Sequence, residues 1–402
     1  MTRRQYFVVI LILGALSTIG PFSIDMYLPA FPAIARDLRT SVSQVQLSLT
    51  SYFIGIAFGQ LLYGPLIDRF GRKKPLYAGL AVYLLATFGC ATAGSIEVLI
   101  GMRLLQALGG CVGLVAAQAL VRDLFPVGKI ASVFSLLTLV IAVSPMIAPT
   151  VGGYATVALG WHSIFLILAG ITVLMLLAIH YLLPDGRPAD ASLSLRPQAV
   201  MGSFFTVLRQ PQFLTYALAG GIATSAPFAY IAGSPDVMMN IYHVSAQQYG
   251  WIFSFIAIAI LAPNQLNHVL LKRFSSEQLV YAAMLYQTLM GILLVLGVWA
   301  GWFGVYGLIA MIFLFLCGQG LISPNASALS MAPFERHAGS AAALMGSFRM
   351  AFGAVASGTV SALHNGTALP MVGTMLACVL TGLTILLIGQ QYKERKRARV
   401  LA

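Results

Sequence analysis

Charged side chains are scarce in this chain. They make up 8% of its 402 residues, whereas a soluble domain averages about 25%. Hydrophobic residues make up 59% of the sequence. This balance excludes an ordinary water-soluble globule and predicts a protein whose main solvent is lipid.

Cysteine and histidine are also few and scattered. The four cysteines, Cys90, Cys111, Cys317 and Cys378, all fall within apolar stretches. No pair has metal-ligand spacing, and the pattern does not indicate a disulfide framework. The six histidines form no metal pair, and no phosphate-cradling Gly-Lys-Ser/Thr loop is present. We therefore expect no metal, no cofactor and no direct coupling to ATP, and an intramembrane enzyme is the weakest hypothesis.

Long apolar stretches are what the chain has in abundance. Stretches of about 20 apolar residues cross a bilayer, and the sequence predicts about twelve of them in two sets of six. The first stretch could also be a secretory signal, although no small-x-small cleavage site follows it. The expected spans are 6–30, 45–66, 75–94, 97–120, 130–155 and 162–183, then 212–233, 247–271, 279–299, 303–328, 338–362 and 368–390.

Basic residues outnumber acidic ones by 23 to 11. A nucleic-acid partner is not expected, because the basic residues lie in short loops and at the ends, as the positive-inside rule describes. With both termini in the cytoplasm, 19 of the 23 fall on the cytoplasmic side. Only Arg36 and Arg39 fall on the other side, while Arg103 and Arg349 lie within spans. This asymmetry predicts an even number of spans.

One long polar break separates the two sets of spans. Within it, Met201, Phe204, Phe205 and Leu208 follow i, i+3, i+4, i+7 spacing, which predicts a short helix lying at the membrane surface. The expected divisions are an N-terminal half at 1–183, a cytoplasmic linker with this interfacial helix at 184–211, a C-terminal half at 212–391 and a basic cytoplasmic tail at 392–402.

A basic turn between the second and third spans carries the most specific motif, residues 64–74 (GPLIDRFGRKK). Gly64 and Gly71 would allow close backbone approach or unusual dihedral angles. Arg69 and Arg72 help to hold the turn on the cytoplasmic side, and Asp68 is its one acidic residue. A purely topogenic loop is the simpler alternative.

This string, Gly-x-x-x-Asp-Arg-x-Gly-Arg-Lys, resembles the signature loop of the major facilitator superfamily. The resemblance covers nearly the whole chain and points to the Bcr/CflA group of drug:proton antiporters. It implies an all-α membrane protein of two six-helix bundles in the bacterial inner (cytoplasmic) membrane, and we expect a monomer. The corresponding loop of the second half keeps Arg273 and Phe274 but has Lys272 in place of the acid.

Asp25 lies late in the first expected span, between Pro21 and Pro29. A charge near the bilayer centre costs about 2.5–3.5 kcal/mol on insertion scales, so a carboxylate there lines a hydrated cavity, has a partner or is protonated. Proton coupling requires a group that alternates between charged and neutral forms, and the resemblance implies an acidic residue at this place. An interfacial Asp that caps a broken helix is the alternative.

Arg103 opens the stretch 103–107 (RLLQA), which resembles the family's Arg-x-x-Gln-Gly motif with Ala107 in place of a Gly. At the helical rise per residue, Arg103 and Asp25 lie at similar depths, about 10 and 8 Å from the outer ends of their spans. Arginine cannot shed its proton. We therefore expect Arg103 to hold Asp25 ionised until substrate or a closing helix intervenes. A structural Arg bonded to backbone carbonyls is the alternative.

Residues 144–153 (SPMIAPTVGG) of the fifth span resemble the antiporter motif Gly-x-x-x-Gly-Pro-x-x-Gly-Gly. Ser144 and Ala148 replace two glycines, while Pro149, Gly152 and Gly153 match. Small residues allow close helix packing and prolines kink a span. The resemblance implies that this element seals the two halves on the outside and limits leak. Ordinary packing is the alternative.

At the cytoplasmic face we expect Asp68 to pair with Arg72 or to approach the start of span eleven near Ala338. Asp123, at the end of span four, is another candidate partner for the basic turn. The residues assigned to gating are Gly64, Asp68, Arg69, Gly71, Arg72, Asp123, Ala148, Pro149, Gly152 and Gly153.

Aromatic rings within the spans suit greasy, planar or cationic compounds. Each such residue could equally be a packing residue, and Arg349 could face a cavity or anchor an interface between the halves. The candidate substrate contacts are Tyr27, Tyr52, Phe53, Gln106, Phe228, Tyr230, Gln319, Asn325 and Arg349.

Together these features predict a proton-coupled multidrug exporter that works by alternating access. The expected partners are a small, largely apolar antibiotic, protons and the lipid bilayer, and the resemblance implies bicyclomycin-like and chloramphenicol-like compounds. A proton-coupled transporter of a metabolite such as a sugar or an amino acid is the alternative. The first half offers few hydrogen-bonding groups for a sugar, which favours apolar drugs.

Overall fold

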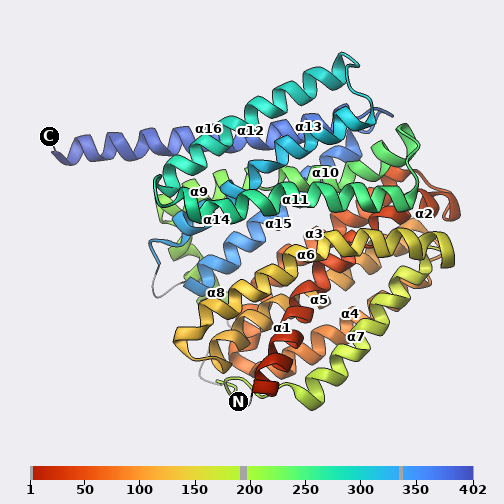
Figure 1. Ribbon diagram of the computed structural model, residues 1–402. Helices are drawn as coiled ribbons and strands as arrows, with labels where there is room; N and C mark the ends of the chain where they lie inside the picture. The colour runs from red at the N-terminus through yellow and green to blue at the C-terminus, as the bar shows by residue number, and fades with distance from the viewer. Residues whose placement is uncertain (1–2, 191–196, 335–337, 402) are drawn as a thin grey trace. The chain divides into compact units, whose positions relative to one another are not determined.

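Helices make up most of the described part of the chain, as a computed structural model shows (Figure 1). The structure describes residues 3–190, 197–334 and 338–401, and these ranges contain no β-strand. Ten helices in them are long and apolar enough to cross a membrane, by length and composition. The prediction of an all-α membrane protein is therefore confirmed.

The chain divides into two compact units. Unit 1 comprises Met1–Val200 and Met238–Ser254, and unit 2 comprises Met201–Val237 and Phe255–Ala402. The predicted halves, 1–183 and 212–391, differ from these units chiefly at 238–254, which pack with the first half. The α-helices of the first part are α1 (Arg3–Asp25), α2 (Phe31–Asp37), α3 (Val42–Phe70), α4 (Lys73–Ala91), α5 (Ile96–Leu124), α6 (Val127–Leu159) and α7 (His162–Leu182).

The linker contains α8 (Pro197–Leu208), a helix at the place where the sequence predicts one. Phe204 on this helix is buried, whereas Met201 and Phe205 are exposed. The remaining α-helices are α9 (Pro211–Ala223), α10 (Ala226–Pro235), α11 (Ala246–Leu270), α12 (Ser276–Trp299), α13 (Val305–Cys317), α14 (Gln319–Met331), α15 (Ala338–Ala362) and α16 (Leu369–Leu401), which runs as one helix to the C-terminus (Figure 1).

Two of the twelve expected spans, 212–233 and 338–362, are not among the ten long apolar helices of the described ranges. The first is interrupted at Thr224 and Ser225, so that α9 and α10 are both short. The second is α15, a continuous helix of 25 residues that carries Arg349 and many Gly, Ala and Ser residues. Small residues lower the hydropathy of a span while favouring close helix packing.

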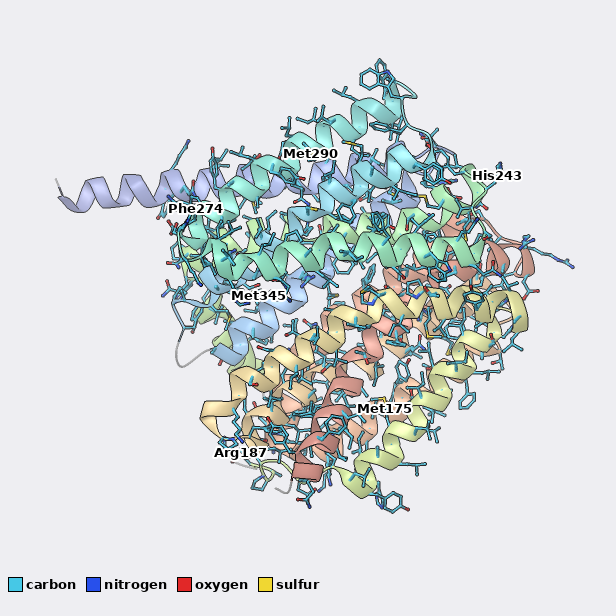
Figure 2. The ribbon with its side chains drawn as sticks, in the orientation of Figure 1. Met175, Arg187, His243, Phe274, Met290 and Met345 are labelled. Atoms are coloured by element: carbon cyan, nitrogen blue, oxygen red, sulfur yellow. The ribbon has the colours of Figure 1, made fainter. Side chains whose placement is uncertain are left out.

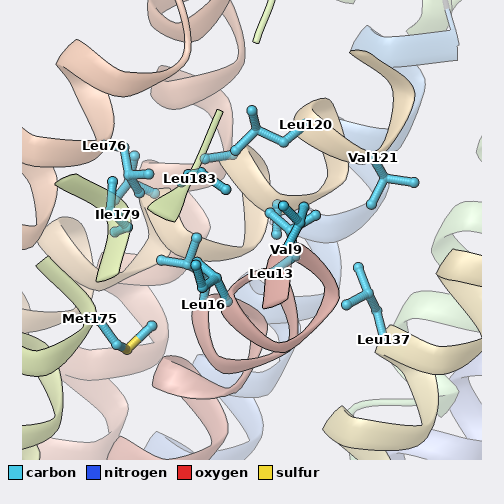
Figure 3. Packing of buried hydrophobic residues seen from close by; sticks show 14 of the residues in the cluster. Val9, Leu13, Leu16, Leu76, Leu120, Val121, Leu137, Met175, Ile179 and Leu183 are labelled. Atoms are coloured by element: carbon cyan, nitrogen blue, oxygen red, sulfur yellow. The ribbon is translucent and has the colours of Figure 1, made fainter. Parts of the chain in front are cut away.

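The core of unit 1 lies where α1 packs against α5, α6 and α7. Figure 3 shows Leu13 and Leu16 of α1 and Leu120 of α5 among the residues of this core. Glycine also allows α3 and α5 to pack closely. A methyl group at Gly55 of α3 would lie 2.6 Å from the Cβ of Ala107 and 2.7 Å from a carbonyl oxygen of α5. The α3–α5 contact therefore fixes the position of the α5 residues just before Ala107.

Bulky apolar side chains project outward from the long helices, as the sticks in Figure 2 show. Phe58 of α3 is 61% exposed, Leu85 of α4 is 72% exposed and Leu174 of α7 is 67% exposed. A soluble protein rarely exposes contiguous apolar surface on this scale. These faces are suited to contact with lipid chains, whereas the backbone polar groups are satisfied within the helices.

The basic turn at 64–74 is shorter than expected, because α3 continues to Phe70 and α4 begins at Lys73. Only Gly71 and Arg72 lie between the helices. Gly71 has φ 82° and ψ 174°, a region open essentially to glycine alone, so its predicted unusual dihedral angle is confirmed. The same prediction for Gly64 is wrong. Gly64 lies inside α3 without positive φ and with open space around it.

Replacing Gly71 with Ala should destabilise the protein by about 1–3 kcal/mol, because the side chain forces a disallowed backbone conformation. The measurement is the thermal unfolding midpoint of purified protein in detergent. Gly64→Ala is the matched control in the same motif, since it adds a methyl group to open space in a helix. Equal midpoints for the two variants would contradict this assignment.

Candidate functional site

The first span is broken at Asp25. α1 ends at this residue, and a turn leads through Tyr27 into the short 3-10 helix η1 (Leu28–Ala30) and then α2. Pro29 lies in η1, where its missing N–H and fixed φ help to interrupt the α-helical pattern. The Asp25 side chain is buried, with 4% of its residue surface exposed. Among the described residues it has no hydrogen bond and no ion pair.

Arg103 of α5 is fully buried among aromatic rings. Its Cζ lies 4.1 Å from the ring centre of Tyr52, 4.5 Å from that of Tyr27 and 6.0 Å from that of Phe165. The ring faces carry partial negative charge and attract the guanidinium, by about 2 kcal/mol or more where water is excluded. The cage joins α3, α5 and α7 to the chain that follows Asp25.

The polar contacts of Arg103 are incomplete. Its Nη1 donates to Oε1 of Gln106 at 2.7 Å, and Nε2 of Gln106 donates to Oγ1 of Thr87 at 2.8 Å. The Nε and Nη2 atoms are buried and have no hydrogen-bond partner in the described part of the chain. Unsatisfied buried donors of a charged group are costly. This guanidinium can therefore donate further hydrogen bonds to an oxygen atom of a carboxylate or of a bound molecule.

Asp25 and Arg103 were expected to interact, but they form no ion pair among the described residues. Tyr27, two residues after Asp25, is instead the residue that contacts Arg103, and its hydroxyl lies 2.8 Å from Oγ of Ser48. Nor does Arg103 donate to a backbone carbonyl in the described ranges. The structure thus brings Arg103 to the break in the first span without joining the two charges.

The predicted substrate residues of unit 1 lie close together. Tyr27, Tyr52 and Gln106 all contact Arg103, and we call these four residues the Arg103 cluster. Phe53 follows Tyr52 on α3 and is also buried. Both ends of the Gln106 amide are occupied by Arg103 and Thr87, so this side chain has little capacity to bind a solute.

The predicted polar residues of unit 2 tie α14 to its neighbours. Nε2 of Gln319 donates to the carbonyl of Ala223 at the end of α9, at 2.8 Å. Nδ2 of Asn325 donates to Oδ1 of Asn267 on α11, at 2.7 Å. Asn267 is 6% exposed and was not singled out from the sequence, where a single polar residue near a span end gave no signal.

The remaining candidates of unit 2 lie on α10 and α15. Phe228 and Tyr230 are buried on α10. A methyl group at Gly353 of α15 would lie 2.8 Å from the Phe228 ring, so this glycine lets the two helices pack closely. Arg349 is exposed on α15 within unit 2.

The glycine pair of the fifth expected span packs against two different backbone segments within unit 1. A methyl group at Gly152 of α6 would overlap the carbonyl oxygen of Met26, the residue after Asp25. One at Gly153 would lie 2.6 Å from the carbonyl oxygen of Ala246, the first residue of α11. Ala148 on the same helix is fully buried. These close approaches leave no space for a side chain at either glycine.

The first turns of α11, which contact this motif, also contain small residues. A methyl group at Gly250 would lie 2.8 Å from Cα of Thr150 and 2.9 Å from the carbonyl oxygen of Pro149. Ser254 donates to the carbonyl of Met146 at 2.5 Å. Ala246, Gly250 and Ser254 recur every four residues and so share one face of α11. This small-xxx-small pattern, which was not among the predicted motifs, explains why 238–254 belong to unit 1.

Arg72 organises the turn between α3 and α4. Its Nη1 lies 2.6 Å from Oδ1 of Asp68, which confirms the first partner expected for that acid. Its Nε and Nη2 donate to the two carboxylate oxygens of Asp123 at 2.7 and 3.3 Å, a bidentate pair. Asp123 is thus confirmed as a partner of the basic turn. Arg69 instead lies over the ring of Phe70, at 6.0 Å from its centre.

Burial by itself would lower the pKa of Arg72, but the hydrogen bonds from its guanidinium to Asp123 and Asp68 outweigh that effect and raise its pKa. Arg72 is 7% exposed, Asp123 is 14% exposed and Asp68 is 57% exposed. Of the two acids, Asp123 is therefore the better shielded from solvent and the stronger partner.

The linker docks onto the same turn through 185–187. The backbone N–H of Arg187, labelled in Figure 2, donates to Oδ2 of Asp123 at 2.9 Å. Lys73 at the start of α4 pairs with Asp185 at 2.8 Å. A methyl group at Gly186 would lie 2.6 Å from Cγ of Arg72. This docking was not predicted, because the linker residues carry no motif.

No group of three or more His, Cys, Asp or Glu residues that could hold a metal ion occurs in the described ranges. The four cysteines are free thiols. The candidate site therefore consists of buried charges, aromatic rings and closely packed helices.

Comparison with known proteins identifies the family. The model of the Major Facilitator Superfamily matches residues 11–358, and the chain belongs to this family of transporters. The chain is 32% identical over 377 residues to a bicyclomycin resistance protein homolog of Haemophilus influenzae, covering 94% of each. It is 30% identical over 392 residues to a chloramphenicol resistance protein of Pseudomonas aeruginosa, covering 93% of this chain and 89% of the relative.

The fold is also that of a solved transporter. A bacterial homolog of the human lysosomal transporter Spinster, in an inward-facing and occupied conformation, matches with a TM-score of 0.75 over 97% of this chain and 98% of its own. The two sequences are 13% identical, so this likeness concerns the fold. The family expected from the signature motif is confirmed, and with it a transporter rather than an enzyme.

Replacing Asp123 with Asn should destabilise the protein by about 1.5–3 kcal/mol, because hydrogen bonds to charged groups have about that strength. Asp68→Asn is the matched control and should cost at most about 1 kcal/mol, since its pair with Arg72 is half open to water. Thermal unfolding in detergent compares the two, and hydrogen exchange should show faster opening of the N–H of Arg187 only in Asp123→Asn. Equal losses of stability in both variants would refute the conclusion that Asp123 is the stronger partner of Arg72.

Proposed function

We propose that this protein exports several kinds of small, largely apolar antibiotic from the bacterial cytoplasm in exchange for protons. Membership of the Major Facilitator Superfamily supports alternating access as its mode of transport. The two relatives described above are named for resistance to two different antibiotics, which supports a broad range of drugs for this chain.

Asp25 carries this proposal. It is buried, it ends α1 at the break in the first span, and it has no partner in the described part of the chain. A carboxyl group in such a place can bind a proton, and it needs a compensating charge or water once the proton has left. We assign Asp25 as the group that takes up and releases the transported proton.

Arg103 is the proposed compensating charge. Its Nε and Nη2 are buried without a partner in the described ranges, and Tyr27 connects it to the chain just after Asp25. In the proposed cycle, a drug arriving from the cytoplasm favours proton loss from Asp25, and the carboxylate then pairs with Arg103. On the outer side a proton returns to Asp25, the pair separates and the drug leaves.

The proton gradient supplies enough energy for useful accumulation. Moving one charge across 100 mV yields about 2.3 kcal/mol, which at about 1.36 kcal/mol per tenfold step supports a drug gradient of about 50-fold. No further cofactor enters this scheme.

The Arg103 cluster supports an aromatic or otherwise greasy substrate. The rings of Tyr27 and Tyr52 pack on the guanidinium, and Gln106 is fully engaged with Arg103 and Thr87, so the cluster leaves few hydrogen-bonding groups for a substrate. A sugar site needs many free hydrogen-bonding groups, because a buried hydroxyl without a partner is costly. This favours drug export over the alternative, transport of a metabolite such as a sugar.

The two motifs with close backbone contacts are the proposed gates. Gly71, Arg72, Asp68 and Asp123 form the inner gate, which the linker docking at 185–187 supports. Ala148, Pro149, Gly152 and Gly153 form the outer gate, which the small residues of α11 support. Such packed contacts have two discrete arrangements rather than a continuous range, as a gate requires.

The proposed location is the bacterial inner membrane, with both termini in the cytoplasm. The concentration of 19 of the 23 basic residues on one side supports this orientation. A monomer suffices for the mechanism, since Asp25 and Arg103 lie in one chain.

Replacing Asp25 with Asn should abolish proton-driven export, because an amide cannot bind and release a proton. The measurement is drug uptake by inside-out vesicles that contain the purified protein and carry an imposed pH gradient. Downhill exchange of labelled against unlabelled drug should remain, which separates loss of coupling from loss of folding. Full gradient-driven uptake by this variant would exclude the proton role of Asp25.

Replacing Gly153 with Ala should weaken the α6–α11 contact and let protons leak. The added methyl group would lie 2.6 Å from the carbonyl oxygen of Ala246, which forces the helices apart. We expect vesicles carrying this variant to lose an imposed pH gradient faster than wild type when no drug is present. Gly128→Ala, on the same helix but with nothing within 4 Å of the new group, is the control. Identical decay of the pH gradient in both variants would contradict a sealing role for Gly153.

A further inference from the structure

A buried acid in unit 2 has a histidine partner that the proposed transport cycle does not use. Asp236 follows α10 and opens the π-helix η2 (Asp236–Ile241). Its Oδ2 lies 3.4 Å from Nδ1 of His364, which follows the end of α15. The Asp236 side chain is 9% exposed and that of His364 is 32% exposed. Water therefore reaches the imidazole much more readily than the carboxylate.

Close helix packing holds the two residues together. α10 packs against α15 and α16. A methyl group at Gly233, three residues before Asp236, would lie 2.8 Å from Met371 of α16. Gly353 brings α15 equally close to α10. The acid is thus fixed at the end of α10, beside the turn that leads from α15 to α16.

That turn is itself ordered by local hydrogen bonds. Oδ1 of Asn365 accepts bonds from the N–H and the hydroxyl of Thr367, at 3.1 and 2.7 Å. Oγ1 of Thr367 accepts a bond from the N–H of Leu369 at the start of α16. Gly366 has φ 73°, which lets the chain reverse. His364 is therefore held in place by its neighbours rather than by its pair with Asp236 alone.

Other titratable groups on these elements lie further along the helices. Arg349 lies thirteen residues before the end of α15, about 20 Å along its axis, and Tyr230 lies six residues before Asp236, about 9 Å along α10. His364 is the nearest basic group to Asp236 on α10, α15 and α16 in the described ranges. The other titratable residues on or next to these elements are Tyr242, His243, Cys378, Tyr392 and the charged residues at 393–397 and 399, at the far end of α16.

We propose that Asp236 and His364 form a second proton-binding site, at the outer end of unit 2 and separate from Asp25. The ligand is a proton taken by the imidazole from the external solution. Imidazole is the side chain that ordinarily gains or loses its charge within the physiological pH range. The protonated ring attracts the buried carboxylate and ties the α15–α16 turn to the end of α10. At higher pH this attraction is lost, so the outer end of unit 2 responds to external acidity.

The test is a double-mutant cycle of Asp236→Asn and His364→Gln, measured as thermal midpoints in detergent at pH 5.5 and pH 8. At pH 5.5 we expect the two losses to be non-additive by about 2–4 °C, the scale of a partly buried ion pair. At pH 8 they should add. His268→Gln, an exposed histidine on α11 of the same unit, should show no coupling with Asp236→Asn.

A charge-preserving variant keeps the test decisive if either substitution harms folding. His364→Lys should retain its coupling to Asp236 at both pH values, because an ammonium group stays protonated at pH 8. Additive losses at pH 5.5, or equal coupling of the His364→Gln cycle at both pH values, would overturn the proposal.

A transport measurement then separates this site from Asp25. Drug uptake into inside-out vesicles is followed at several absolute pH values, with the difference between the two sides kept at one unit. We expect His364→Gln to lose part of the dependence on absolute pH while retaining gradient-driven uptake, which Asp25→Asn loses. Unchanged pH dependence in His364→Gln would remove the site from transport, and it would leave the role of Asp25 untouched.

Discussion

A guanidinium group cannot escape burial by giving up its proton, and much of unit 1 follows from that constraint at Arg103. Two tyrosine rings and the Gln106 side chain surround the charge, while Gly55 draws α3 against α5 close to it. The cage nevertheless leaves two of the three guanidinium nitrogens without a partner in the described ranges. A charge that is stabilised but incompletely satisfied is suited to exchange partners during a cycle. The break in the first span supplies the acid that we propose as the second partner.

The sequence predicted the class and much of the inner turn, because both depend on local or compositional signals. Hydropathy marked most of the spans, and the motif placed Asp68 only four residues before Arg72, so that the turn at Gly71 can bring the two side chains together. The same reasoning failed for the shape of the turn. Arg and Lys are good helix formers, so the charged residues extend α3 and α4 almost until they meet, and Gly64 became an ordinary helical residue.

What the sequence could not predict depends on pairs of residues far apart in the chain. The linker contacts of Asp123, the bond between Asn325 and Asn267 and the Asp236–His364 pair each join segments whose neighbourhood only tertiary packing decides. For Asp25 and Arg103, by contrast, a contact was predicted that the structure does not show among the described residues. Equal depth in the bilayer fixes one coordinate of a side chain and leaves the other two open, so similar depth did not amount to contact. The small residues at Ala246, Gly250 and Ser254 could have been found from their spacing alone.

The two consecutive glycines of α6 have one more consequence. Neighbouring residues of an α-helix point about 100° apart, so Gly152 and Gly153 give α6 two distinct bearing faces, one on the peptide after Asp25 and one on the first residue of α11. Any rotation or sliding of α6 therefore changes both contacts at once, the one beside the acid and the one at the start of α11. A substitution that displaces α6 cannot alter one of these contacts alone.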